Sequence, residues 1–369
     1  MAARLKPPFR ADQVGSLLRP PALAEARARH KAGTIGDAEL RRVEDDCIRD
    51  AVKMQEEVGL KGITDGEFRR HDWIMDFKYA LGGVRIVGGE VTAPFQSEKG
   101  PIDWGFIQYS IDEKIHLKEA IFAEHFKFLK PLVHQTAKIT VPSPSMMHFP
   151  AGRGIDRKAY PDLDEFMDDL VRVYTEEMMA LYGLGCRYLQ FDDTSLAFLN
   201  SPRMRAQFGA DGERQHETYI RVLNRIIAGK PADLALTIHL CRGNFRSGWI
   251  SEGPYDHVAE ALFGDLDIDG YFLEYDDQRS GGFEPLRYLP KGGKMVVLGL
   301  VTTKKPALEP KDLLKRRIEE ASKFVDIDQL CLSPQCGFAS TEEGNELTIE
   351  EEKAKLRLVV ETAAEVWGG

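Results

Sequence analysis

The 369-residue sequence lacks three features that would each point to a class of protein: a long hydrophobic run, an excess of basic residues and a cysteine framework. No stretch of about 18 apolar residues is present to form a membrane-spanning helix, and no apolar stretch of a secretory signal follows the basic N-terminus. The net charge of −10 argues against nucleic acid as a partner, because binding phosphates requires a basic face. Five cysteines, an odd number, argue against a disulfide framework. We therefore expect a cytoplasmic globular protein that binds neither membranes nor nucleic acid.

The hydrophobic pattern alternates short, almost continuously apolar runs with helical stretches. Such runs are typical of parallel strands that are buried on both faces. Eight strands are predicted, over residues 10–16, 62–67, 138–143, 188–193, 234–241, 270–276, 295–301 and 329–336. Apolar residues at steps of three and four predict helices over residues 37–58, 163–183, 215–228, 255–262, 311–325 and 349–367. The alternation predicts the α/β class and a single (β/α)8 barrel, a TIM barrel, over residues 1–369.

One segment, residues 70–131, departs from this alternation. It contains a hairpin-like stretch over Val84–Phe95 and then a helical pattern from about Asp112. We interpret the segment as an insertion after the second strand. Because it follows the strand that carries Glu67, we predict that it closes over the substrate as a lid.

Polar and sulfur-bearing side chains gather where the predicted strands end, which is where the active site of such a barrel lies. His239 and Cys241 are two residues apart on one strand, so their side chains share a face. With Glu274 and Cys336 they offer an imidazole, two thiolates and a carboxylate, a set that suits tetrahedral zinc. Burial without a metal remains the alternative for these cysteines, and we interpret the other three as core residues: Cys47, Cys186 and Cys331.

Several segments resemble the catalytic barrel of cobalamin-independent methionine synthase, and more closely its short, single-barrel homologues. The matching segments, from Val14 to Ser340, are QVGSLLRP, GITDGEFRRHDW, YLQFDD, IHLCRGNF, GYFLEYDD, VVLGLVTTK and SPQCGFAS. The resemblance implies methyl transfer to a thiol, with homocysteine as the acceptor. It also implies a zinc ion that binds the acceptor sulfur and is held by His239, Cys241, Glu274 and Cys336.

The same resemblance implies roles for further residues. Ser16, Glu67 and Asp192 would hold the amino and carboxylate groups of the acceptor, and Asp193 is a further candidate beside them. Glu274 would leave the metal when the substrate sulfur arrives. The structural alternatives are a helix cap at Asp192 and Asp193, and an ion pair between Glu67 and a neighbouring arginine, Arg69 or Arg70.

The sequence also departs from the family pattern on the side of the methyl donor. Lys304 stands where the family has a histidine that shuttles a proton, so we take Lys304 as a catalytic candidate together with Glu274 and Asp192. The loop after the third predicted strand has His148 and Phe149 but lacks the tryptophan that stacks on a folate donor. Methyl-folate and methylcobalamin therefore both remain candidate donors, the second delivered by a corrinoid protein.

Three other functions stay open. One is alkyl transfer to another thiol, as in the epoxyalkane:coenzyme M transferases, whose sulfonate acceptor would need basic residues such as Arg19, Arg242 or Arg246. Carboxylates at Glu67 and Asp192 favour an amino acid instead. The others are a metal-free relative similar to uroporphyrinogen decarboxylase and a zinc-storage protein without catalysis. The oligomeric state is left open.

Overall fold

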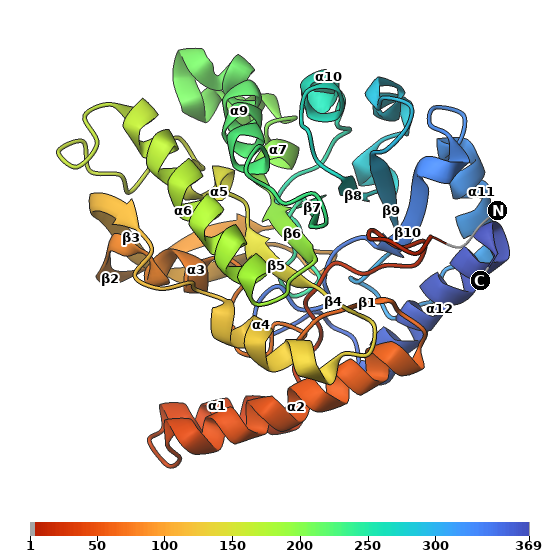
Figure 1. The fold of residues 1–369 in the computed structure, drawn as a ribbon, viewed down its shortest axis with the longest axis horizontal. Helices are drawn as coiled ribbons and strands as arrows, with labels where there is room; N and C mark the ends of the chain where they lie inside the picture. The colour runs from red at the N-terminus through yellow and green to blue at the C-terminus, as the bar shows by residue number, and fades with distance from the viewer. Residues whose placement is uncertain (1–3, 369) are drawn as a thin grey trace.

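The computed structural model describes residues 4–368 (Figure 1). Within them, parallel strands are hydrogen-bonded in the same order in the sheet as along the chain. These strands are β5 (Ile139–Pro142), β6 (Tyr188–Asp193), β7 (Ala235–Leu240), β8 (Gly270–Glu274), β9 (Met295–Val301) and β10 (Leu330–Pro334). Their residues are almost all buried, as the continuous apolar runs predict. The α/β class is confirmed.

Two short strands extend this series at one end. β1 (Gly62–Ile63) pairs in parallel with β4 (Thr136–Ala137), and the chain runs from β4 into β5. At the other end, the predicted first strand is reduced to an isolated bridge between Ala11 and Leu332 of β10. Two backbone hydrogen bonds form this bridge, from the N–H of Asp12 to the carbonyl of Leu332 over 3.0 Å and from the N–H of Leu332 to the carbonyl of Arg10 over 2.8 Å.

Helices surround the strands in Figure 1. The long helices are α1 (Pro21–Lys31), α2 (Asp37–Glu57), α6 (Leu163–Gly183), α9 (Gln215–Ile227), α10 (Asp256–Gly264), α11 (Lys311–Ala321) and α12 (Ile349–Trp367). All six predicted helices are confirmed, and α12 begins at a capping box between Thr348 and Glu351. The shorter helices are α3 (Met75–Ala80), α4 (Ala123–Leu129), α5 (Ser145–His148), α7 (Ser195–Phe198) and α8 (Pro202–Arg205).

The segment between β1 and β4 holds α3, then an antiparallel hairpin longer than predicted, and then α4. Its strands are β2 (Gly82–Phe95) and β3 (Ile102–His116). The helix predicted from about Asp112 is confirmed only as α4, which begins at Ala123, and the predicted start is wrong because β3 continues to His116. Ile111 and Ile115 are both buried, and a spacing of four residues suits one face of a strand as well as one face of a helix. Pairing with β2 decides for the strand.

Within the described residues, no helix combines the length and hydrophobicity that crossing a membrane requires.

Candidate metal and substrate site

Three buried side chains with soft or nitrogen donors meet at one point of the structure. His239 lies on β7, Cys241 directly follows that strand, and Cys336 follows β10. One ligand atom from each residue lies within 4.8 Å of the other two, and the sulfurs of Cys241 and Cys336 are 3.3 Å apart. Two strands separate β7 from β10 in the sheet, so the sheet must curl to bring these residues together.

The donor atoms of this group have unmet bonding capacity. Both ring nitrogens of His239 are buried without a hydrogen-bond partner, and such groups in a native structure call for an explanation. The Cys336 thiol donates to Cys241 and holds the pKa of Cys241 well below its usual range, while the pKa of Cys336 is raised. An unpartnered imidazole beside two buried cysteine sulfurs 3.3 Å apart fits a zinc ion in both chemistry and burial.

Glu274, the fourth predicted ligand, ends β8 beside this group but lies outside it. Its Oε2 accepts a hydrogen bond from the backbone N–H of Arg242 over 3.1 Å. Its Oε1 has no hydrogen-bond partner and lies 3.9 Å from Nη2 of Arg279. Three of the four predicted ligands are thus brought together, and the fourth has one carboxylate oxygen without a hydrogen-bond partner.

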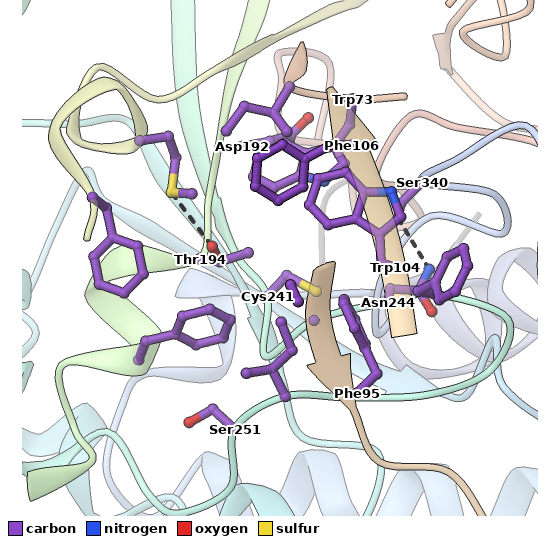
Figure 2. Close-up of a pocket in the computed structure, with 18 of the residues that line it drawn as sticks. Trp73, Phe95, Trp104, Phe106, Asp192, Thr194, Cys241, Asn244, Ser251 and Ser340 are labelled. Atoms are coloured by element: carbon purple, nitrogen blue, oxygen red, sulfur yellow. Dashed lines mark hydrogen bonds between the residues drawn. The ribbon is translucent and has the colours of Figure 1, made fainter. Parts of the chain in front are cut away.

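The three-residue group opens into a cavity of about 840 Å³ (Figure 2). The predicted substrate-binding residues line the same cavity: Ser16, Glu67, Asp192 and Asp193. An aromatic wall faces them, which the sequence analysis missed. It is formed by Trp73 and Phe95 together with Trp104 and Phe106 of β3, which Figure 2 shows among the residues around Cys241. The sequence signal for this wall was the spacing of Trp104 and Phe106, which are two residues apart and therefore share one face of a strand.

The sequence profile of the cobalamin-independent synthase catalytic domain matches residues 9–365. This chain belongs to that family. The uncharacterized protein YxjG of Bacillus subtilis (strain 168) is 46% identical over 370 residues, which cover 99% of this chain and 96% of that protein. A methionine synthase of Pyrococcus abyssi is 22% identical over 330 residues, covering 88% of this chain and 85% of that protein.

The fold agrees with this membership. A solved structure from Listeria monocytogenes, of a protein assigned by name to the vitamin-B12-independent methionine synthases, has a TM-score of 0.80 to this chain. The two sequences are 41% identical, and the match covers 99% of this chain and all of that one. The resemblance inferred from the sequence is confirmed, and the protein is a methionine-synthase-like catalytic domain.

In this family member the two adjacent aspartates at the end of β6 have different surroundings. Asp193 is fully engaged: its carboxylate accepts from the hydroxyls of Ser145 and Ser195 and from the N–H of Leu196. Asp192 accepts only from Gln190, over 2.7 Å, and burial raises its pKa to about 7. Asp193 is thus bound to the first turn of α7 and to neighbouring hydroxyls, while Asp192, which lines the cavity, retains acceptor capacity.

Glu67 has similar spare capacity. Its Oε1 accepts from the hydroxyl of Thr140 over 2.7 Å and lies 3.7 Å from Arg70, but its Oε2 is buried without a partner. Its φ of 61° is unusual for a residue other than glycine, and strain of this kind is often found at functional sites. Ser16 packs closely against Gly337. A Cβ atom added to Gly337 would lie 1.9 Å from the Oγ of Ser16.

The basic residues considered for this site have other contacts. Arg19 donates to backbone carbonyls, including that of Ala339 over 2.6 Å, and Arg242 does so to Gly253 over 2.8 Å. Arg246 is exposed and lines a second cavity of about 390 Å³. Lys304 lines that second cavity too, and its ammonium donates to the loop that follows Cys241.

His148 and Phe149, the two aromatic residues that follow β5 where the family has a folate-stacking tryptophan, have different surroundings. Phe149 lines the main cavity, whereas Nδ1 of the buried His148 lies 3.0 Å from the hydroxyl of Tyr219.

Proposed function

We propose that this protein is a zinc-dependent methyltransferase that moves a methyl group onto a thiol, with homocysteine as the preferred acceptor and methionine as the product. The observation that carries the proposal is the buried group of His239, Cys241 and Cys336 in a cavity that also presents Glu67 and Asp192. Those three residues would hold the zinc, with Glu274 as the fourth ligand through its free carboxylate oxygen. Bound zinc would lower the pKa of the acceptor thiol, so that a thiolate is present near neutral pH.

The residues around the metal group would orient the acceptor. An ammonium group needs anionic acceptors. Glu67 has a buried oxygen without a partner, the Asp192 carboxylate accepts only from Gln190, and both residues line one cavity. Ser16, at the cavity wall, would donate to the acceptor carboxylate. The thiolate would then form the new carbon–sulfur bond as the methyl group leaves its donor. A cavity of about 840 Å³ leaves room for a donor beside an amino acid.

The alternative is alkyl transfer to a different thiol, as in epoxyalkane:coenzyme M transferases. Of the three arginines considered for a sulfonate acceptor, Arg19 and Arg242 are bound to backbone carbonyls, and Arg246 lines the second cavity. The carboxylates in the cavity therefore favour an amino-acid thiol. The donor stays open between methyl-folate and methylcobalamin, and a corrinoid protein would be a partner only with the second.

The test is methionine formation by the zinc-loaded protein from homocysteine, with methyl-folate and methylcobalamin offered separately. We expect methionine from one of the two donors, and none when homocysteine is left out. Absence of product with both donors, from folded protein with a full zinc content, would overturn homocysteine methylation. Coenzyme M with an epoxide would then be the next acceptor and donor pair.

We also propose that the strands close into the full (β/α)8 barrel and that residues 70–131 form a lid inserted into it. The backbone N–H of Leu17, the residue directly after the first predicted strand, donates to the carbonyl of Gly66 in the segment after β1 over 3.1 Å. The hairpin supplies Trp104 and Phe106 to the cavity wall, so a bound substrate would contact it.

Limited proteolysis tests the lid. We expect cleavage within residues 70–131 to slow when homocysteine is added to the zinc-loaded protein, because the hairpin then packs on the ligand. A thiol too small to reach the hairpin, such as 2-mercaptoethanol, serves as the control. Equal cleavage rates with and without homocysteine would count against a lid.

A further inference from the structure

The loops that carry the two cysteines are tied together by one side chain, Asn244. Its Nδ2 donates to the carbonyl of Gly337 over 2.8 Å and to the hydroxyl of Ser340 over 3.1 Å. Asn244 lies three residues after Cys241, and Gly337 directly follows Cys336. A single amide group therefore connects the backbone beside one thiol to the backbone beside the other.

The oxygen of the same amide is also engaged. Asn244 Oδ1 accepts from Nζ of Lys304 over 3.0 Å and from Nδ2 of Asn345 over 2.9 Å. Lys304 donates further to the carbonyls of Gly243 over 3.2 Å and Gly248 over 3.0 Å. All three protons of its ammonium thus have acceptors on residues 243–248, which we call the clamp loop. Asn244, Lys304 and Asn345 are each at most 7% exposed, so water competes little for these bonds.

The clamp loop has a conformation that needs such support. Arg246 and Ser247 have backbone φ values of 45° and 64°, which residues other than glycine rarely adopt. Asn345 holds this turn as well, because its Oδ1 accepts from the N–H of Ser247 over 2.9 Å. Strained backbone persists only where its surroundings over-determine it. Here the surroundings that hold it are the same groups that connect the two cysteine loops.

We propose that Asn244, Lys304 and Asn345 are positioning residues. They set the separation of the Cys241 and Cys336 sulfurs, and thereby the affinity of the three-residue site for zinc. The proposal rests on the proposed function, since it presumes that the group binds zinc. It replaces a proton-transfer role for Lys304 with one exerted through the clamp loop. Groups that orient metal ligands change metal affinity by about 10- to 100-fold when they are removed.

The experiment compares zinc affinity, by competition with a chromophoric chelator, among the wild type, Asn244→Ala and Lys304→Met. We expect both variants to bind zinc about 10- to 100-fold more weakly than the wild type. Lys304→Arg should recover part of the loss, because it restores a donor to the clamp loop. Lys305→Met is the matched control, because Lys305 is exposed and pairs with Glu98. The absorption spectrum of bound Co²⁺ gives a second readout that reports thiolate geometry.

The outcomes separate the two proposals. If the wild type binds zinc and Asn244→Ala and Lys304→Met match it in affinity and Co²⁺ spectrum, the positioning role is overturned and the metal site stands. If the wild type binds no zinc, both proposals fail. Should either variant fail to fold, Ser340→Ala removes only one contact of Asn244, and a zinc affinity equal to wild type would then overturn the proposal.

Discussion

Replacing Cys336 with serine is expected to reduce the zinc content of the purified protein from about one ion per chain to less than about a tenth of that. Serine keeps the shape of the side chain but offers a hydroxyl, which does not ionise near neutral pH as the thiol of a metal site does. Thiol activation by a metal is worth several kcal/mol, so methyl transfer should fall by about 1,000-fold or more. Cys241→Ser should have the same effect, because its sulfur lies 3.3 Å away in the same group.

Metal analysis and the methyl-transfer assay check this result on tag-free protein. Cys47→Ser is the matched control, since Cys47 is buried on α2 outside the metal group, and it should retain its zinc. Full zinc content in Cys336→Ser would exclude this cysteine as a ligand. A folded wild type without zinc would overturn the zinc-dependent function as a whole.

Asp192→Asn is expected to lower kcat/KM for homocysteine by about 10- to 100-fold, mainly through KM. The reason is that the ammonium loses one of its two anionic acceptors, and an unmet hydrogen bond to a charged group costs about 1.5–3 kcal/mol. The asparagine oxygen still accepts from Gln190, so folding should be preserved. Zinc content should not change. Glu67→Gln should act in the same direction, because it removes the second acceptor.

Two comparisons make this prediction specific to the amino group. Methylation of a simple alkyl thiol without an amino group should be the same in Asp192→Asn and the wild type. Asp193→Asn should mainly lower the melting temperature, because it disturbs bonds to Ser145 and Ser195 rather than a free site. An equal loss of activity toward both kinds of thiol would contradict a role for Asp192 in binding the ammonium.

Patterns that depend on near neighbours in the chain were readable from the sequence. Helical periodicity predicted α6 and α12 with the bounds that the structure has, because amphipathic spacing is local. The buried strands were equally readable, since strands covered on both faces are continuously apolar. Residues of the right chemistry at strand ends then pointed to His239, Cys241 and Cys336 before any fold was known.

Where one pattern suits two structures, the sequence did not decide. Ile111 and Ile115 fit a helix or a strand, and the residue of β2 that pairs with Ile111 is Val84, 27 residues earlier in the chain. The aromatic wall was missed for the same reason. Trp104 and Phe106 face the cavity only because the hairpin turns back over it.

The sequence by itself determined the α/β class, most helices, the family and the donor types gathered at the strand ends. All of these depend on composition, periodicity or residue type. Only the tertiary structure decided how each polar group is used. It shows that Asp193 and Arg19 are engaged by neighbours, that Lys304 holds the clamp loop, and that Glu274 has one carboxylate oxygen free. Whether a polar side chain is already hydrogen-bonded or can still bind a ligand depends on the neighbours that folding places around it. Those neighbours lie far away in the chain.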